Sequence, residues 1–524
     1  MSLPDPSAPD DHVPFSASEV WQDLRRFYQT QGIAAWDDKV PFMASSHALL
    51  AESYSQAIRT FWLEALPAPS LPLIVLELGA GHGAFSFALL QRLCQWRERT
   101  GQTFPFVYIM SDLAEANVAF WRSHPALAPY VERKCLDFAV WNAETDAPLV
   151  TEIQAIRLDP AAPCAQPLVV VANYLFDSLA CEYLQVKDDV MYRGWMPRDP
   201  ALQMAVQETH FLLPSLRFFP MQEGELRDPH GLLPGLGAAY AGRDDAASFL
   251  FPASAIGVLD HFRSIAGATS LFLVADKGSA RPRASLPAAA PVLAIHHSLS
   301  AEVPFDILSD WARRCGGDPY VTVTGQPVQQ AGFLFAAQAM PCTRELLRHQ
   351  FVSCPAGDVF TLMQALAERG EEQTLRTLIA CLNACQWDTF VFDNLYPSLR
   401  RRLALEPQLP QQLADLLDGI ARIDAQYYAF PGRHDTFGHI GQLLHMLGQS
   451  RAAIHFYQRA RTEGHDLPAT RLAIGECLLA LEDWRNAQGW FEAVLEEVPG
   501  HYLALGYLDT CREKSALAGG GAIA

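Results

Sequence analysis

The chain has 524 residues, of which half are hydrophobic and 19% are charged, a composition typical of folded globular protein. At ~100–200 residues per domain, this length predicts two or three domains. The 39 basic and 58 acidic residues give a net charge of −19, and so anionic a surface repels both phosphate backbones and anionic membranes. We therefore expect neither nucleic acid nor a membrane as a partner.

The N-terminal part is predicted to be a tail followed by helices. Residues 1–15 are acidic and proline-rich and lack the order of a signal peptide, so a flexible tail is expected. Residues 16–70 carry apolar side chains mostly three to five positions apart, which predicts a helical segment. Eleven cysteines without a regular framework indicate a reducing compartment, and every apolar run falls short of the ~20 residues of a membrane span. A cytoplasmic location is the resulting expectation.

Strands and helices alternate over residues 71–340. Helices are predicted at Ala84–Trp96 and Ala114–Ser123. Apolar runs that predict buried strands lie at Leu73–Leu78, Phe106–Met110, Val131–Leu136, Leu168–Ala172 and Ser270–Ala275. Continuous apolar strands separated by helices indicate an α/β Rossmann-like, doubly wound parallel sheet.

Two segments depart from this alternation. Residues 187–260 are rich in turns and in acidic and histidine residues, among them His230, and predict an insertion or cap between the fourth and fifth strands. Tyr320–Thr324 and Gly332–Ala336 flank a Gly–Gln–Pro loop and predict a hairpin at the end of the sheet.

Residues 358–515 show helical patterns only and contain an internal repeat. Gly438–Arg461 aligns with Leu472–Leu495 at an offset of 34 residues. The matched positions are Gly441 with Gly475, Leu444 with Leu478, Ala453 with Ala487 and Phe456 with Trp490. A 34-residue period of paired helices resembles the tetratricopeptide repeat, which predicts an all-α domain that binds a protein substrate or partner.

Polar residues follow the predicted strands at the ends that would share one crevice. The first strand ends in Glu77–Leu78–Gly79–Ala80–Gly81–His82–Gly83, where the glycines permit close approach to a ligand. Glu77 suits an ammonium group, and Asp112 suits a pair of ribose hydroxyls. Asp137 is placed for an adenine amino group beside Phe138, and Asn173 ends the fourth strand. Such an ordered set predicts a ligand in the crevice that carries ammonium, ribose and adenine groups rather than a pyrophosphate.

On these segments, and on Asn173–Tyr174–Leu175–Phe176–Asp177 and Ala275–Asp276–Lys277–Gly278, residues 40–340 resemble a class I S-adenosylmethionine (SAM)-dependent methyltransferase. The resemblance is to the MidA-type family, which includes the mitochondrial complex I assembly-factor arginine methyltransferase. It implies SAM as cofactor and a side-chain nitrogen, such as arginine, as methyl acceptor. The implied cofactor-binding set is Glu77, Gly79, Ala80, Gly81, Gly83, Asp112, Leu113, Asp137, Phe138 and Asn173.

Four residues are expected to serve the chemistry. Asp177 and Glu182 would orient the substrate, Asn173 would hydrogen-bond the nucleophile, and Tyr174 would wall the methyl pocket. The family usually has Glu where this chain has Tyr174. No metal site is predicted, because Cys381 and Cys385 lack further ligands at zinc-like spacing.

Three alternatives stay open from the residues. The first is a non-catalytic, SAM-binding scaffold or assembly factor, motivated by Tyr174. The second is a small-molecule or lipid methyltransferase whose repeats serve assembly. The third is a nicotinamide-dependent oxidoreductase, since Ala84 satisfies the dinucleotide fingerprint three residues after Gly81.

Overall fold

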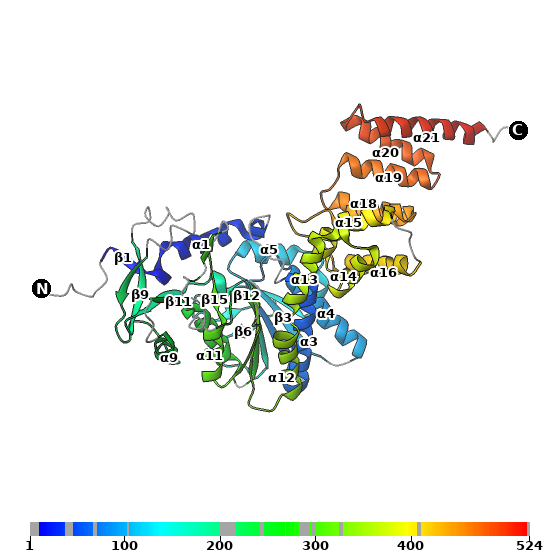
Figure 1. Ribbon diagram of the computed structural model, residues 1–524. Coiled ribbons are helices and arrows are strands. Elements are labelled where there is room, and N and C mark those ends of the chain that lie inside the picture. Colours follow the sequence, from blue (N-terminus) through cyan, green and yellow to red (C-terminus); the bar gives the residue numbers. More distant parts are fainter. Residues whose placement is uncertain are drawn as a thin grey trace. The chain divides into compact units, whose positions relative to one another are not determined.

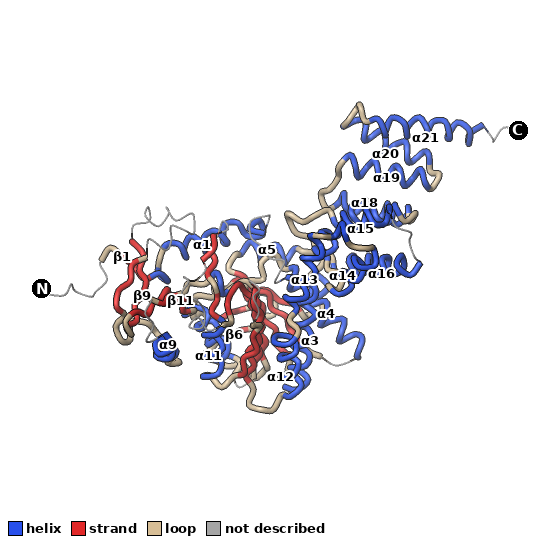
Figure 2. The backbone as a smooth tube through the Cα atoms, in the orientation of Figure 1, coloured by secondary structure: helices blue, strands red, loops and turns tan. Residues whose placement is uncertain are grey.

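The chain forms two compact units, Met1–Phe360 and Thr361–Ala524. A computed structural model describes residues 10–36, 46–65, 71–101, 104–198, 216–240, 246–267, 269–281, 291, 293–295, 299–323, 328–405 and 410–520. Strands and helices mix in the first unit, whereas the described part of the second is helical (Figure 2). Among the described helices, none has the length and apolar character needed to cross a membrane.

The first unit is built on a mixed, mainly parallel sheet. Its strands run in the order β16-β17-β12-β7-β2-β3-β4, and β17 is antiparallel to both of its neighbours. The strands are β2 (Leu73–Leu78), β3 (Phe106–Asp112), β4 (Leu136–Val140), β7 (Leu168–Asn173), β12 (Ser270–Ser279), β16 (Asp318–Val321) and β17 (Val328–Phe335). The doubly wound sheet and its terminal antiparallel pair are as predicted, while the Gly325–Gln326–Pro327 loop lies outside the described residues.

Helices cover both faces of this sheet (Figure 1). On one face, α10 (Ala253–Ile265) and α11 (Phe305–Arg314) share a hydrophobic cluster with Leu76, Val170 and Phe272. On the other, α3 (Ala48–Ala65) packs against α4 (Ala84–Thr100) and α12 (Pro341–Arg348). The strands between them are fully buried, which explains their continuous apolar sequences.

The third strand is not where the sequence predicts it. Val131 belongs to the short helix α6 (Ala128–Glu132), and the strand is β4, whose five residues begin at Leu136. This shift places Asp137 second in the strand rather than after it. The prediction failed because an apolar run alone cannot distinguish strand from helix over so few residues.

A second, antiparallel sheet contains the described strands of the inserted segment, together with β8 before it and a strand from the N-terminal part of the chain. Its order is β1-β9-β8-β11, with β10 on β9. The strands are β1 (His12–Pro14), β8 (Glu182–Lys187), β9 (Val190–Pro197), β10 (Arg217–Pro220) and β11 (Ala247–Phe251). The predicted tail over residues 1–15 is therefore wrong for its described part, because β1 pairs with β9 and Phe15 is fully buried.

The remaining elements of the first unit connect these layers. They are η1 (Phe15–Ala17), α1 (Glu19–Gln31), η2 (Gly32–Trp36), α5 (Glu115–Ser123), β5 (Leu149–Val150), β6 (Arg157–Leu158), η3 (Phe176–Ser178), α9 (Leu232–Tyr240), β13 (Leu293–Ile295), β14 (Leu299–Ala301), β15 (Val303–Pro304) and η5 (His349–Ser353). Helix α13 (Ala356–Glu368) spans the boundary between the units.

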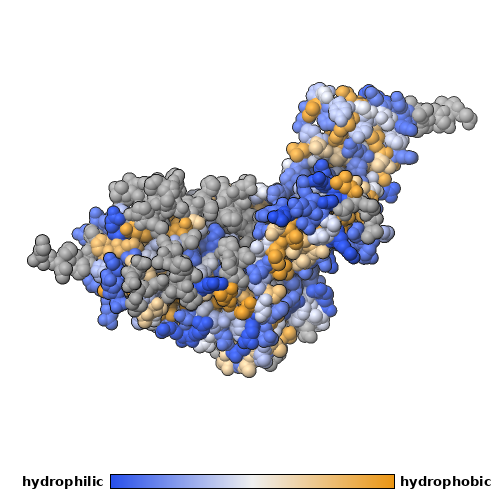
Figure 3. Space-filling view, viewed as in Figure 1, coloured by the Kyte–Doolittle hydropathy of each residue, from blue (hydrophilic) through white to orange (hydrophobic). Residues whose placement is uncertain are grey.

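The second unit consists of paired helices. They are η6 (Gly370–Glu372), α14 (Leu375–Ala384), α15 (Thr389–Leu405), α16 (Pro410–Gln426), α17 (Thr436–Met446), α18 (Ser450–Thr462), α19 (Pro468–Ala480), α20 (Trp484–Glu497) and α21 (Tyr502–Gly520). On the face shown in Figure 3, hydrophilic residues predominate and hydrophobic residues are scattered among them.

The same glycine–aromatic contact occurs in two of these helix pairs. A Cβ at Gly441 would lie 2.7 Å from Tyr457, and a Cβ at Gly475 would lie 2.5 Å from Phe491. Both contacts repeat at the predicted offset of 34 residues. The aromatic residue against each glycine is the one after the predicted Phe456 and Trp490. Glycine at these places allows α17 to approach α18, and α19 to approach α20.

Candidate functional site

A pocket opens at the carboxyl ends of β2, β3, β4 and β7. From β2 the chain continues to β3 on one side, while β7 pairs with β2 on the other. Doubly wound sheets bind ligands at such a switch point, outside the carboxyl ends of the strands. The lining includes most of the predicted residues: Glu77, Gly79, Ala80, Gly81, Asp112, Leu113, Asn173, Tyr174 and Asp177.

The loop after β2 needs its glycines. Gly79, Gly81 and Gly83 have φ angles of +65°, +56° and +85°, in the left-handed region that side chains disfavour. A Cβ at Gly79 would also come within 3.4 Å of Leu175. Gly83 is the residue before α4 and lies beside the pocket lining rather than in it. The loop therefore presents backbone to the pocket.

Glu77 lies at the base of this loop and is almost completely buried. Its Oε2 accepts hydrogen bonds from the hydroxyls of Ser86, at 2.5 Å, and Tyr108, at 2.6 Å. Burial raises the pKa of Glu77 to about 7, although both hydrogen bonds oppose the rise. Near neutral pH this carboxyl group can respond to a cation by losing its proton.

Asp112 ends β3 and ties the loop to the neighbouring strand. Its Oδ2 accepts the Gly81 N–H at 3.0 Å, and its Oδ1 accepts the Ala114 N–H at 2.9 Å. Burial raises the pKa of Asp112, and these backbone hydrogen bonds oppose that rise. Two acidic groups thus flank one side of the glycine loop.

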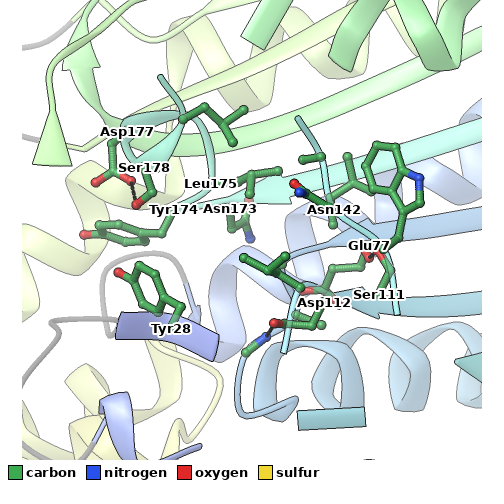
Figure 4. A pocket seen from close by; sticks show the side chains of 18 of the residues that line it. Tyr28, Glu77, Ser111, Asp112, Asn142, Asn173, Tyr174, Leu175, Asp177 and Ser178 are labelled. Carbon is green, nitrogen blue, oxygen red and sulfur yellow. Dashed lines mark hydrogen bonds between the residues drawn. The ribbon is translucent and has the colours of Figure 1, made fainter. Parts of the chain in front are cut away.

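The turn after β7 forms the other end of the pocket (Figure 4). Tyr174 has a φ of +50°, and its N–H donates to the Ala275 carbonyl at 2.9 Å. The buried Asp276 accepts the N–H groups of Phe176, at 2.7 Å, and Asp177, at 3.2 Å. Burial and the nearby Asp177 raise the pKa of Asp276. Asp276 therefore fixes the conformation of this turn.

Asp177 is the carboxyl group presented at this end. It accepts a 2.8 Å hydrogen bond from Ser178, and burial raises its pKa to about 6 despite that bond and the charge of Lys277. Figure 4 shows Tyr174 and Tyr28 beside it, and Asn173 between this end and the Glu77 end. Asn173 Oδ1 accepts a hydrogen bond from the Tyr54 hydroxyl at 3.1 Å.

Two predicted cofactor residues lie elsewhere. Asp137 is completely buried in β4 and accepts three backbone hydrogen bonds, from Phe138, Ile153 and Gln154, at 2.8–3.0 Å. Neither Asp137 nor Phe138 is among the residues lining the pocket. Because β4 extends further than predicted, the residues that line the pocket after it are Trp141, Asn142, Ala143 and Glu144.

Glu182 also lies away from Asp177's pocket. Arg193 donates to both of its carboxylate oxygens, at 2.9 and 2.6 Å, and Ser16 donates to Oε1 at 2.6 Å. These contacts join β8, β9 and the N-terminal segment. Glu182 therefore serves the second sheet, and its carboxylate is not presented to a ligand in this pocket.

Several lining residues were not predicted. Leu24, Arg25 and Tyr28 come from α1, and Ser300 comes from β14; no sequence motif marks them. Lys277, by contrast, belongs to the Ala275–Gly278 segment noted in the sequence, which lies within β12. Its Nζ is 5.7 Å from the centre of the Tyr174 ring and 3.4 Å from Ser300 Oγ.

Comparisons with known proteins give distant structural similarity only. No family model matches the chain. No curated protein matches it either. An uncharacterised protein from Burkholderia thailandensis aligns with 14% identity and a TM-score of 0.38, over 63% of this chain and 89% of that one. A protein described as a likely methyltransferase, from the same organism and bound to S-adenosyl-homocysteine, aligns with the same identity, TM-score and coverages. An O-methyltransferase family protein from that organism aligns with 11% identity and a TM-score of 0.28, over 61% of this chain and 64% of that one. Similarity at this level assigns no activity to this chain.

Proposed function

We propose that this chain is a SAM-dependent methyltransferase that methylates a side-chain nitrogen of a protein. The observation that carries the proposal is that one pocket has Glu77 and Asp112 beside a left-handed glycine loop and Asn173 and Asp177 at its other end. The mixed sheet, with its one antiparallel strand inserted near the edge, fits a class I methyltransferase fold.

The pocket residues suit SAM chemically. Glu77 would take the ammonium group, and Asp112 would accept hydrogen bonds from ribose hydroxyls. Leu113, Trp141 and Asn142 replace Asp137 and Phe138 as the residues expected around the adenine. Bound there, SAM would supply an electrophilic methyl group.

The chain's own contribution would be positioning and proton removal. Near-attack geometry can be worth roughly 7–11 kcal/mol in such a transfer. Asp177, with its raised pKa, would accept the proton that the acceptor nitrogen loses. Asn173 would orient that nitrogen, and the rings of Tyr28 and Tyr174 would exclude water from it. This leaves one carboxylate where the sequence predicted two.

A groove beside the pocket supports a cationic acceptor. Arg25 and Glu144 line both cavities, so the groove adjoins the Asp177 end. Its lining carries more acidic than basic residues: Glu144, Asp146, Asp159, Glu182, Asp228 and Asp260 against Arg25 and Arg227. Arg25, Arg157 and Arg193 pair with Glu144, Asp159 and Glu182, so the excess negative charge rests on the other three acids. The paired helices of the second unit would recruit the protein that carries the acceptor, since stacked helix pairs form peptide-binding surfaces.

Calorimetric titration of the full chain with SAM and with S-adenosyl-homocysteine tests the cofactor. Saturable binding that Gly81→Arg abolishes and Asp112→Asn weakens is the expected result. Asp310→Asn, an exposed acid on α11 with the same charge change, is the matched control and should bind as the unaltered chain does. No binding by a folded chain would overturn the proposal. Transfer of labelled methyl groups to protein in a lysate, rather than to small molecules, tests the acceptor.

A second candidate function is a scaffold that binds SAM without catalysis. Glu182 is engaged by Arg193, and Tyr174 stands where the resembled family has Glu, so few carboxylates face the acceptor. SAM binding without methyl transfer to protein, peptide or small-molecule acceptors would favour this candidate.

A further inference from the structure

A cysteine, a histidine and a carboxylate meet in the first unit, away from the proposed SAM pocket. His230 Nε2 lies 2.6 Å from Asp260 Oδ2, and His230 Nδ1 lies 3.5 Å from Cys315 Sγ. The three residues come from different places: the turn before α9, helix α10 and the C-terminal end of α11. The imidazole thus bridges a carboxylate and a thiol through its two nitrogens.

The carboxylate of this group is itself held in place. Trp311 Nε1 donates to Asp260 Oδ1 at 3.1 Å, which leaves Oδ2 toward His230. Arg263 approaches the same Oδ1 at 3.5 Å, and Arg314 donates to the His230 carbonyl at 3.0 Å. Surrounding residues therefore hold both His230 and Asp260 in place in the absence of any ligand.

We propose that Cys315 is a nucleophilic thiol, with His230 as its general base and Asp260 as the carboxylate that orients the imidazole. The carboxylate accepts a hydrogen bond from Nε2–H, which fixes the tautomer, so the Nδ1 lone pair faces the sulfur. Burial raises the pKa of the Cys315 thiol, so the sulfur is protonated at rest. The proton moves to Nδ1 as the sulfur attacks.

The fitting substrate class is a small, neutral electrophile, and a hydroperoxide is the natural example. The sulfur attacks the terminal peroxide oxygen and the O–O bond breaks. The thiol proton passes through His230 Nδ1 to the departing alkoxide, which leaves as an alcohol. Sulfur is oxidised by two electrons to a sulfenic acid, and the peroxide is reduced by the same two.

His230 and Asp260 line the groove beside the proposed SAM pocket together with Asp228, whereas Cys315 lies behind them and is not among its lining residues. Cys315 itself is half-buried. The charges that act on the thiol have both signs, since Arg263 and Asp260 shift its pKa in opposite directions. Neither an anionic nor a cationic reagent is therefore favoured there.

The test is the rate at which iodoacetamide alkylates each cysteine of the full chain at pH 7, followed by mass spectrometry of digests. The exposed Cys354 is the internal reference, and the buried Cys181 reports unfolding because it stays unmodified in a folded chain. We expect Cys315 to react about tenfold faster than Cys354, the reverse of their order of exposure. His230→Gln should lower the Cys315 rate by on the order of 100-fold, and Asp260→Asn by about tenfold.

The control is His261→Gln, which alters another histidine of the same groove that makes no contact with Cys315 in the described structure. It should leave the Cys315 rate unchanged. Treatment with cumene hydroperoxide should then give a Cys315 sulfenic acid that dimedone traps, and His230→Gln should prevent it. The proposal would be overturned if Cys315 reacts more slowly than Cys354 in the unaltered chain. It would also be overturned if Cys315 reacts as fast in His230→Gln as it does in the unaltered chain. One equivalent of zinc in the purified chain that His230→Gln removes would also overturn it, in favour of a metal site.

Discussion

The hydroxyl of Tyr54, on helix α3, donates a 3.1 Å hydrogen bond to Oδ1 of Asn173 at the end of β7. Tyr54 is fully buried, and its ring packs edge-on against Phe85 and Phe351. A helix from before the sheet thus orients the amide that lies between the two ends of the pocket. Asn173 was predicted as a site residue, but nothing in the sequence indicated its partner.

Tyr54→Phe keeps the ring and removes only this hydrogen bond. We expect kcat for methyl transfer to fall by up to about tenfold, the equivalent of one ordinary hydrogen bond, while the SAM Kd stays unchanged. Steady-state kinetics and calorimetry measure the two effects separately. Tyr320→Phe, on β16 at the sheet edge, is the control and should change neither. An equal loss of SAM affinity would mean that Tyr54 supports the whole pocket rather than Asn173.

Asp177 should set the acidic limb of the pH profile. As a base it works deprotonated, so kcat/KM should fall about tenfold per pH unit as the pH drops below its pKa of about 6. Ser178→Ala removes a hydrogen bond that lowers this pKa, so the limb should move to higher pH. Asp177→Asn should abolish the limb and lower kcat by about 10²–10⁴-fold. A limb that stays in place in Ser178→Ala would count against this role.

Glu77 should make SAM binding depend on pH. Its pKa of about 7 means that a part of the population carries a proton at neutral pH, and an ammonium group favours the charged form. The Kd should therefore rise as the pH falls, by about tenfold from pH 8 to pH 6, with proton release on binding. Titrations in buffers of different ionisation enthalpy detect that release. Glu77→Gln should bind weakly at both pH values without it.

Asp137→Ala should separate stability from binding. Asp137 accepts three backbone hydrogen bonds, two of which, from Ile153 and Gln154, fix the segment after β5, so its loss should cost about 3 kcal/mol in the free energy of unfolding. Because Asp137 does not line the pocket, the SAM Kd of the folded protein should not change. Urea unfolding and calorimetry measure the two quantities. A large loss of affinity in a folded variant would restore the role that the sequence suggested.

Gly475→Ala tests the repeated contact in the second unit. The new Cβ would lie 2.5 Å from Phe491, so the helices must separate, and we expect a loss of about 1–3 kcal/mol. Gly489→Ala, on an exposed face of α20 with nothing within 4 Å, should instead stabilise by about 0.5–1 kcal/mol. Thermal unfolding ranks the two. Similar effects from both would show that close helix approach at Gly475 is not what the glycine provides.

The sequence predicts the central strands well because each is buried on both faces and reads as an unbroken apolar run. β2 has the predicted bounds, and β3 ends at Asp112. Strand ends fix the position of their polar residues, so Glu77, Asp112 and Asn173 are found together in the pocket. The error at β4 shows the converse, since a few residues of displacement move Asp137 from a strand end into a strand.

Contacts between segments far apart in the sequence could not be predicted from apolar runs and strand ends. Tyr28 and Arg25 lie on an amphipathic helix whose spacing indicates only that one face is buried. Glu182 looked like a substrate carboxylate because it follows Asp177 closely in sequence. Its partner Arg193 lies beside it because β8 pairs with β9, and the sequence does not indicate that pairing.

The pairing of β1 with β9 has a consequence for the growing chain on the ribosome. His12 lies opposite Pro197, so the first strand must wait for 185 further residues to be made before its partner exists. At ~5–20 residues per second, this delay is on the order of ten to forty seconds. During that interval Phe15 and Trp21 have each other, but the later members of their hydrophobic cluster, such as Tyr183 and Met196, have not yet been made. The apolar side chains of the N-terminal segment are therefore exposed to solvent in the nascent chain until β8 and β9 have been made.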